Sequence, residues 1–383
     1  MTVRPTGHPY DRKVQFEGDE LCWVRKEALA GSEFLVVDEG PGLSGSTFLA
    51  VGDALVAAGV ARQRIVLLSS RVPDSDALLA PDGGRRWREF RAHSSTLSLE
   101  LPREAKIDVG GGQWRRHFHA ADEALWPACW PAMERRKLLS QDGRRLFKFE
   151  GLGRFGAENL ERAARLFRVG FGLPPREEGD GFVSYPRLSG RPLHVSDCGA
   201  SLLVRLADYC AVRASTFPAK APVAGEIDAM VRANFLAEFG RERGGGEPLE
   251  ILRPIFADGR MMPHEWVRAP SGDILKVDAV SHGDDHFFPG PTDIAWDLAG
   301  AIVEWRMNRE ARRLFLARYE HASGDRAEAR LPAYLVAYTL FRLAYSKMAA
   351  EAVGDSDEAP RLRGDYRRYR AILSEFALRS GSR

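Results

Sequence analysis

The sequence of 383 residues is 44% hydrophobic, which gives it enough apolar surface for two or three domains. Its 55 lysines and arginines nearly balance its 53 aspartates and glutamates, so the net charge gives no argument for a nucleic-acid partner. No apolar run could span a bilayer, and residues 1–15 contain no apolar core of signal-peptide length. These features predict a globular, cytoplasmic protein that does not contact a membrane.

The four cysteines show no C-x-x-C spacing. This scatter favours reduced thiols over a zinc site or a disulfide framework.

The first third of the chain has an α/β pattern. Residues 34–38 are a short apolar run typical of a buried parallel strand, residues 48–60 have helical spacing, and residues 64–70 form a second apolar run. This order predicts a parallel β-loop-α-β unit. We therefore expect a first domain over residues 1–125, with a partial, Rossmann-like α/β fold.

The rest of the chain changes from strands to helices. Residues 145–150 follow a turn-forming segment and predict a hairpin, and GLGRFG (151–156) reads as a loop before the next helix. Beyond residue 193 the pattern is mostly helical. We expect an α+β, two-lobed second part, with a β-rich lobe over residues 126–190 and a helical lobe over residues 191–383.

The segment VVDEGPGLSGST (36–47) places two acids at the end of a strand and a loop of glycines and hydroxyls before a helix. The acids offer acceptors for sugar hydroxyls, and the start of the helix offers backbone N–H donors for a phosphate. The pattern predicts a ribose-phosphate site.

This segment resembles the phosphoribosyl-pyrophosphate (PRPP) loop of type I phosphoribosyltransferases. The resemblance implies that two acids bind the ribose hydroxyls, namely Asp38 and Glu39. It implies that four residues hold the 5′-phosphate: Ser44, Gly45, Ser46 and Thr47. The ligand would be PRPP or a ribose 5-phosphate compound. Too little chain precedes the strand to supply the rest of such a site, so the domain is truncated or a partner chain supplies the missing strands.

The second part is similar to the aminoglycoside phosphotransferase and choline kinase group of the protein-kinase-like fold. The similarity lies in the strand residue Lys148, the helix after it, YPRLSGRPL (185–193) and the segment 263–301. It implies that Lys148 contacts the phosphates of ATP and is held by a helix carboxylate, either Glu158 or Glu161. YPRLSGRPL would connect the lobes and meet the adenine.

The same similarity assigns roles to aspartates late in the chain. A strand pair turning at Gly272 would deliver Asp278, which matches the metal-binding aspartate of the group. Asp293 and Asp297 match its structural and loop-anchoring positions, although Asp293 equally reads as a helix N-cap. In SHGDDHFF (281–288), Asp284 is a candidate for a second Mg²⁺ contact.

The catalytic loop departs from the pattern of the group, which has His-x-Asp and then an Asn five residues later. In FADGRMMPHEWV (256–267), PHEW stands near the place of Pro-Gly-Asn, and no Asp precedes it by five residues. Asp258 is the candidate base, and Glu265 or His264 is the candidate replacement for the metal-binding Asn.

Together these patterns predict an ATP- and Mg²⁺-dependent phosphotransferase that acts on a small hydroxyl-bearing metabolite, such as a nucleoside or a ribose-phosphate compound. Two alternatives stay open. One is phosphoribosyl transfer completed by a partner chain, and the other is a non-catalytic regulatory protein, or pseudokinase, that binds a nucleotide or a ribose phosphate.

Overall fold

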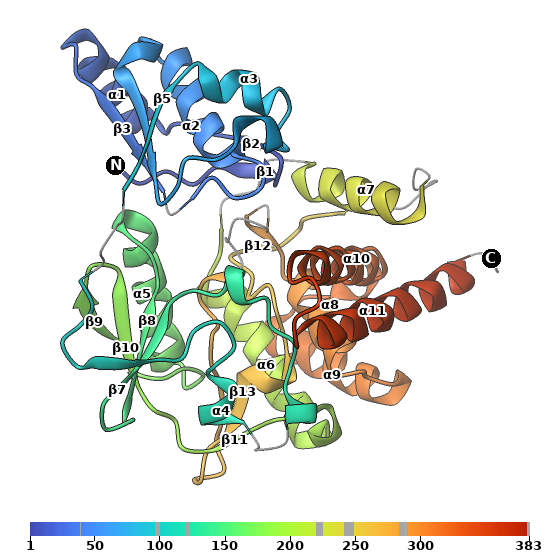
Figure 1. Ribbon diagram of the computed structural model, residues 1–383. Coiled ribbons are helices and arrows are strands. Elements are labelled where there is room, and N and C mark those ends of the chain that lie inside the picture. Colours follow the sequence, from blue (N-terminus) through green and yellow to red (C-terminus); the bar gives the residue numbers. More distant parts are fainter. Residues whose placement is uncertain are drawn as a thin grey trace. The chain divides into compact units, whose positions relative to one another are not determined.

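The computed structural model describes residues 1–380 except 39, 96–99, 120–122, 220–224, 241–248, 283–287 and 289. The chain divides into two compact units, the first over residues 1–100 and 285–289 and the second over residues 101–284 and 290–383 (Figure 1). Among the described residues, no helix combines the length and apolar character needed to cross a bilayer.

The first unit is an α/β layer. Its elements are β1 (Thr6–His8), β2 (Asp11–Lys13), α1 (Gly18–Leu29), β3 (Phe34–Val37), α2 (Ser46–Ala57), β4 (Ile65–Ser69), α3 (Gly83–Arg88) and β5 (Arg91–Ser94).

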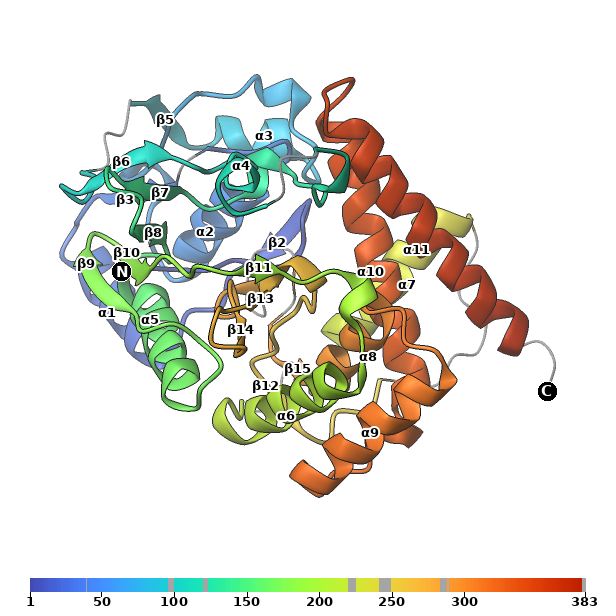
Figure 2. The same ribbon diagram turned by 90° about the horizontal axis from the view of Figure 1, so that it is seen from below.

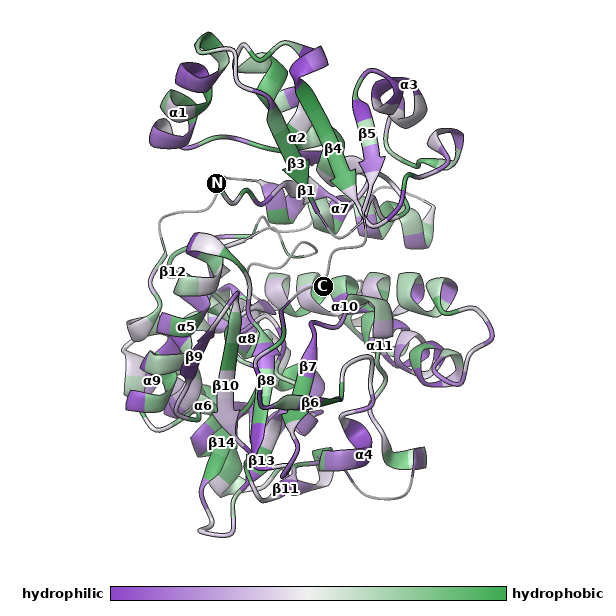
Figure 3. Ribbon diagram, turned by 60° about the vertical axis from the view of Figure 1, so that its left-hand side comes forward, coloured by the Kyte–Doolittle hydropathy of each residue, from purple (hydrophilic) through white to green (hydrophobic). Residues whose placement is uncertain are grey.

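Strands β3, β4 and β5 pair in parallel, in that order, which confirms the parallel pairing predicted for the first two. Phe34 and Ile65, from the first two strands, pack with Phe48 and Leu55 of α2 in one apolar core. Figure 3 shows the hydrophobic colour of β3 and β4 beside the mostly hydrophilic β5. The first two strands therefore pack one face against α2, while Leu35 and Val37 on the other face of β3 are exposed.

The second unit begins with β strands and ends with helices. Its strands are β6 (Ala105–Asp108), β7 (Lys137–Ser140), β8 (Arg145–Phe149), β9 (Arg176–Gly179), β10 (Phe182–Pro186), β11 (Arg191–Pro192), β12 (Pro254–Ile255), β13 (Trp266–Arg268), β14 (Ile274–Lys276) and β15 (Thr292–Asp293). Its helices are α4 (Arg115–Phe118), α5 (Gly153–Arg168), α6 (Ala200–Thr216), α7 (Glu226–Phe239), α8 (Ala295–Glu304), α9 (Arg309–Ser323), α10 (Leu331–Ala352) and α11 (Ala359–Ser380).

Five antiparallel strands form the main sheet, in the order β6-β7-β8-β10-β9. The β7-β8 pair is the predicted hairpin, and that prediction is confirmed. Strand β6 pairs with β7, and the buried Arg115 forms an ion pair with Glu358 at the other end of the unit. Residues 101–119 therefore belong with the second unit, which differs from the boundary predicted at residue 125.

The GLGRFG segment, predicted to be a loop before the helix, is a tight turn at Gly151 and Leu152 followed by the first turn of α5, which begins at Gly153. Gly151 has φ +123°, and a Cβ on Gly156 would lie 2.0 Å from the Gly151 carbonyl oxygen. Only glycine fits such a close approach of the backbone. The turn has a structural explanation of its own.

The helical lobe is built around α8, in which every residue is buried. Trp296 of α8 packs edge-on against Tyr338 and Phe341 of α10, with ring centroids 5.5 and 5.6 Å apart. The helical segments predicted beyond residue 193 are confirmed.

A small sheet, β11-β13-β14, lies between the main sheet and the helices α6 and α8 (Figure 2). Strands β13 and β14 pair antiparallel around a turn at Gly272, where φ is +93°, as predicted. Asp278 follows two residues after the end of β14.

Candidate active site

Lys148 lies in β8, the middle strand of the main sheet. Successive side chains of a strand face opposite sides. Because Phe147 packs in the apolar core with Leu138 and Phe182, Lys148 faces the other side together with Glu150. The Lys148 Nζ lies 3.1 Å from Glu150 Oε1, and both side chains are buried. The ammonium is therefore held by a carboxylate only two residues away in the sequence.

Asp278 meets the same lysine from the second lobe. Its Oδ1 accepts a hydrogen bond from the Lys148 Nζ, and the Lys137 Nζ lies 3.6 Å from its Oδ2. Its φ of +56° is rare for a residue other than glycine, and such outliers persist only where the surroundings hold them, often at functional sites. The fold thus brings together two groups that are 130 residues apart in the sequence.

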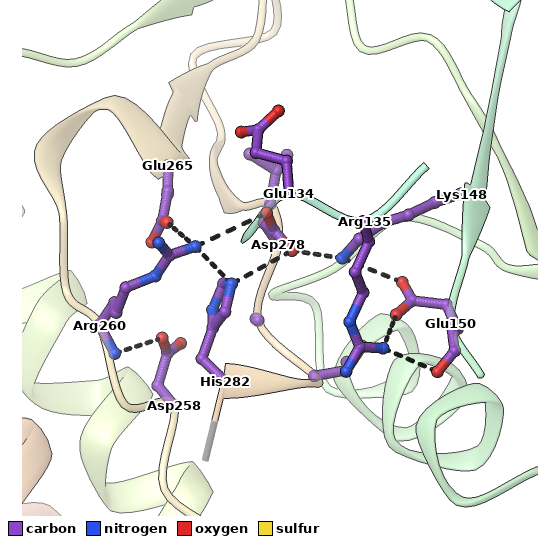
Figure 4. A network of polar contacts seen from close by, with 12 residues as sticks. Glu134, Arg135, Lys148, Glu150, Asp258, Arg260, Glu265, Asp278 and His282 are labelled. Atoms are coloured by element: carbon purple, nitrogen blue, oxygen red, sulfur yellow. Dashed lines mark hydrogen bonds and ion pairs between the residues drawn. The ribbon is translucent and has the colours of Figure 1, made fainter. Parts of the chain in front are cut away.

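Arg260 lies among the acids of this region (Figure 4). Its Nη2 lies 3.3 Å from Glu265 Oε1 and 4.0 Å from Asp278 Oδ2, and it contacts the Nε2 of His282. These side chains come from the loop before β13, the turn that leads into β13 and the segment after β14. One guanidinium therefore contacts three different groups.

Lys276 compensates the acids on the buried side of the cluster. Its Nζ donates to Glu265 Oε2 at 2.9 Å and lies 3.3 Å from Asp258 Oδ2. All three side chains are buried. Each carboxylate therefore has a cationic partner within the protein.

Asp297 of α8 anchors the loop that carries Asp258. Its carboxylate accepts the backbone N–H groups of Asp258 and Gly259 at 2.8 and 3.0 Å, which matches the loop-anchoring role predicted for it. Burial raises the pKa of Asp297 to about 6, although the guanidinium of Arg213 opposes the shift. The backbone just before Arg260 is thus fixed by two hydrogen bonds.

Asp293 performs both of the functions considered for it. It accepts the N–H of Ala295 at 2.8 Å, as a residue capping the start of a helix does, and the N–H groups of Leu252 and Arg253 at 2.9 and 2.7 Å. Arg330 is its buried ion-pair partner. Its role in the fold is structural.

The environment sets the charge of the central groups. Burial would raise the pKa of Asp278, but the Lys148 ammonium and the other cations outweigh burial and hold that pKa well below its usual range. Burial raises the pKa of Glu265, although Lys276 and Arg260 oppose the shift. Burial, helped by Arg260, lowers the pKa of His282 well below that of a free imidazole. At neutral pH, Asp278 is therefore a carboxylate and His282 is a neutral ring.

The helix carboxylates predicted to hold Lys148 are engaged elsewhere. Glu158 pairs with Arg162 at 3.1 Å, and Glu161 pairs with Arg165 at 2.8 Å along the surface of α5. The partner of Lys148 in this lobe is Glu150, which corrects the expectation. The signal was present in the sequence, because residues two apart in a strand share a face.

Asp258, the candidate base, has no exposed surface. Its carboxylate accepts hydrogen bonds from the hydroxyl of Tyr209 and the N–H of Arg260 and faces Lys276. It therefore cannot reach a substrate hydroxyl in this structure. Its contacts explain instead how the loop is held.

His264, the other candidate near the turn, stacks on Trp114, with ring centroids 5.8 Å apart. Burial lowers its pKa well below the usual value. The ring packs against an aromatic side chain and is not part of the group of possible metal ligands.

Three side chains offer ligand atoms within 4.8 Å of one another, namely Glu265, Asp278 and His282. However, Arg260 contacts all three, and Lys148 and Lys137 also neutralise Asp278. Two unit charges 4 Å apart interact by roughly 4 kcal/mol at an effective dielectric constant of about 20, so each cation here opposes a metal strongly. As arranged, these residues do not fit Mg²⁺.

Two predicted site residues, Glu39 and Asp284, lie outside the described residues. Sequence reasoning missed four side chains of the cluster: Lys137, Glu150, Arg260 and Lys276. Arg260 stands five residues before Glu265, in the place where the pattern calls for an Asp. An arginine in the place of that aspartate was the feature of the sequence from which a guanidinium in the site could have been predicted.

In the first unit, the predicted phosphate loop is bonded to the protein itself. The Ser46 hydroxyl donates to the Pro9 carbonyl oxygen at 2.6 Å, and the Ser44 Oγ lies 3.0 Å from the same oxygen. The N–H of Ser46 donates to Ser44 Oγ, and the N–H of Gly45 donates to the Pro41 carbonyl at 2.7 Å. Three of the four residues predicted to hold a phosphate, Ser44, Gly45 and Ser46, are therefore already hydrogen-bonded within the protein.

Two other residues of that pattern complete the comparison with the prediction. Thr47 is half-buried in the first turn of α2, and the side chain of Asp38 is exposed after β3. Within the described residues, β3 pairs only with β4, so it is an edge strand. The ribose-phosphate ligand and a partner chain that adds strands stay predictions.

A scan against protein-family models gave no match, and a search of curated proteins gave none either. Solved structures do resemble the chain. A choline/ethanolamine kinase family protein from Mesorhizobium loti has 14% identity, with 63% of this chain and 87% of that chain covered and a TM-score of 0.45. Choline kinase LicA from Streptococcus pneumoniae has 15% identity, with 63% and 89% covered and a TM-score of 0.42.

An aminoglycoside phosphotransferase from Alicyclobacillus acidocaldarius has 13% identity, with 74% of this chain and 97% of that chain covered and a TM-score of 0.41. These neighbours are of the kinase-like kind that the motifs around Lys148 and Asp278 resemble. All three TM-scores are below 0.5.

Proposed function

We propose that the second unit binds ATP and transfers its terminal phosphoryl group to a small hydroxyl-bearing metabolite. The convergence of Lys148, from the sheet, with Asp278, from the second lobe, carries the proposal. A structural ion pair needs neither a left-handed backbone at the aspartate nor a second and third cation beside it. An anionic ligand can share the three cations that surround this one carboxylate.

The chemistry of phosphoryl transfer supports the same reading. The reaction depends mainly on positioning the nucleotide and the acceptor and on neutralising the charge of the phosphates. The protein itself takes part in little covalent chemistry. Lys148 and Arg260 offer an ammonium and a guanidinium in one cluster, and Lys137 stands next to them. The guanidinium can bind two phosphate oxygens at once, and the ammonium acts as a point charge.

The acceptor is proposed only as a class. The names of the structural neighbours include choline, ethanolamine, a macrolide and spectinomycin, which all carry hydroxyl or alcohol-like groups. The loop pattern of the first unit adds nucleosides and ribose phosphates to the panel of candidate acceptors. The test therefore uses these compounds as acceptors in an ADP-release assay.

ATP binding tests the proposal directly. In Lys148→Met the ammonium is lost with little change in volume, and we expect the Kd for ATP, measured by calorimetry, to rise at least tenfold. Arg144→Met is the matched control, because the Arg144 side chain is 85% exposed in the β7-β8 turn. Equal ATP affinity in the parent protein and Lys148→Met would contradict the proposal.

A second candidate function is ATP binding without transfer, as in a regulatory protein. The burial of Asp258 favours it, because the predicted base cannot reach an acceptor hydroxyl. It predicts ATP binding that depends on Lys148 while no acceptor of the panel increases ADP release. Acceptor-dependent ADP release that is lost in Lys148→Met would exclude it.

A further inference from the structure

We infer that Arg260 takes the place of a divalent cation in this site, so that the phosphates of a nucleotide bind without a bound metal. The inference rests on the proposed nucleotide binding for its ligand. The position of the guanidinium itself is a property of the protein, and it can be tested with a metal ion alone.

The first argument is position. The three side chains whose ligand atoms lie within 4.8 Å of one another are the same three that Arg260 contacts through a single nitrogen, its Nη2. A metal held by Glu265, Asp278 and His282 would have to occupy the space of that nitrogen. The acids are therefore arranged around a cation that belongs to the chain.

The second argument is that the arrangement is built into the backbone. The amides of the two residues before Arg260 are held by Asp297, and the N–H of Arg260 donates to Asp258 Oδ1 at 3.3 Å. Three consecutive backbone groups are thus tied to buried carboxylates. A loop held in this way delivers its side chain to one place, unlike an exposed arginine that meets acids by chance.

The third argument is that the guanidinium can still bind an anion. The Arg260 side chain is 27% exposed, and its contacts with Glu265, Asp278 and His282 are all made by a single nitrogen, Nη2. A guanidinium has five N–H donors in a planar fork that matches two phosphate oxygens. Arg260 can therefore neutralise the acids on one edge and a phosphate on the other, which is the work a bridging metal ion does elsewhere.

The decisive experiment titrates Mn²⁺ alone into the full-length protein, by calorimetry. We expect no binding in the parent protein up to millimolar Mn²⁺, because the guanidinium fills the site. Arg260→Ala removes the guanidinium and leaves the carboxylates of Glu265 and Asp278 with the imidazole of His282. We therefore expect this variant to bind Mn²⁺ at least tenfold more tightly than the parent protein. Metal binding in the parent that is unchanged in Arg260→Ala would overturn the inference.

A second experiment measures ATP binding in EDTA and in excess Mg²⁺. For the parent protein we expect Kd values within threefold of each other. In EDTA, we expect Arg260→Ala to bind ATP at least tenfold more weakly than the parent protein, and in Mg²⁺ we expect its affinity to recover. Arg260→Lys keeps one positive charge, so its affinity in EDTA should lie between those of the parent protein and Arg260→Ala. A parent protein that binds ATP only with Mg²⁺ contradicts the inference and leaves the proposed function standing.

The two proposals fail in distinguishable ways. If the parent protein binds no ATP in either buffer, the proposed function fails, and the Mn²⁺ titration still decides the role of Arg260. If circular dichroism shows that Arg260→Ala does not fold, the role of Arg260 is decided by comparing ATP binding in EDTA and in Mg²⁺ for the parent protein and for Arg260→Lys. Arg144→Ala controls for the general loss of one positive charge.

Discussion

The two candidate sites of this chain are built in opposite ways. The phosphate-type loop of the first unit is continuous in sequence, and its hydroxyls and amides are neutral groups bonded to nearby backbone and hydroxyl oxygens. The cluster of the second unit joins charged side chains from separate segments, with Lys148 and Asp278 130 residues apart. The polar groups of a motif that is continuous in sequence can thus be hydrogen-bonded within the protein itself. A cluster of charged side chains from separate segments keeps groups that a ligand can bind.

The difference also has an energetic side. A hydrogen bond between neutral groups contributes about 1 kcal/mol to stability, whereas removing one partner of a buried ion pair costs about 3–5 kcal/mol because a charge is left uncompensated. Substitutions in the cluster should therefore destabilise the protein more than substitutions in the loop, and only the cluster should respond to pH.

The largest effect is expected for Lys276→Met. The change leaves Glu265 and Asp258 without their shared ammonium in a buried environment. We expect the free energy of unfolding of the full chain, measured in urea, to fall by about 3–5 kcal/mol.

The double variant Lys276→Met with Glu265→Gln is the internal check on that loss. Removing one of the two carboxylates that share the lysine ammonium should restore part of the stability, which a simple packing defect at the lysine would not allow. Arg144→Met, in an exposed turn, should change stability by less than about 0.5 kcal/mol. A loss below about 1 kcal/mol in Lys276→Met would show that the pair does not carry the stability we assign to it.

Local patterns in the sequence were sufficient for part of the second unit. The hairpin that carries Lys148 and the strand pair that precedes Asp278 follow from short apolar runs on either side of turn residues, which act over a few positions. The loop-anchoring position of Asp297 came from the family resemblance, and its contacts with the backbone N–H groups of Asp258 and Gly259 match that expectation.

The partners of those residues were harder to predict. Glu150 instead of a helix carboxylate holds Lys148, and Arg260 rather than a metal lies between the acids. The contact of Glu150 with Lys148 is local, because residues two apart in a strand share a face. The contacts of Arg260 with Asp278 and His282 depend on the tertiary structure. The same holds for Ser46, whose hydroxyl is bonded to the carbonyl of Pro9, a residue 37 positions earlier in the chain.

A smaller effect is expected for Ser46→Ala in the first unit. The Pro9 carbonyl loses its 2.6 Å partner, but Ser44 can still donate to it, so the cost should be about 1 kcal/mol. Hydrogen exchange of the amides of α2, followed by mass spectrometry in the full chain, measures this locally.

Thr47→Ala is the matched control for the loop, because among the described residues Thr47 makes no hydrogen bond to Pro9. It should leave the exchange of α2 nearly unchanged. If Ser46→Ala costs as much as Lys276→Met, the contrast between a neutral loop and a charged cluster is wrong. The Ser46→Ala effect should also be the same at pH 5 and pH 8, because none of the bonded groups titrates in that range.

The smallest effect is expected for His119, whose protonation should make the free energy of unfolding depend on pH. Its ring packs edge-on against Trp114, with centroids 5.2 Å apart, and burial lowers its pKa from 6.5 to about 4, with Arg115 acting in the same direction. The folded pKa is below the unfolded one, so the unfolded chain binds a proton more readily between these values. The stabilising contribution is complete above pH 6.5 and is lost as the pH falls toward 4.

His119→Phe keeps an aromatic ring and removes the titration. Because the ring is only half-buried and solvent screens its charge, we expect the parent protein to lose about 1 kcal/mol more than His119→Phe between pH 8 and pH 5, measured by urea unfolding at both values. His264 lies beside His119 and is present in both proteins, so the difference reports His119 together with its effect on the pKa of His264. Identical pH profiles would mean that the His119 imidazole is as easily protonated in the folded protein as in the unfolded chain.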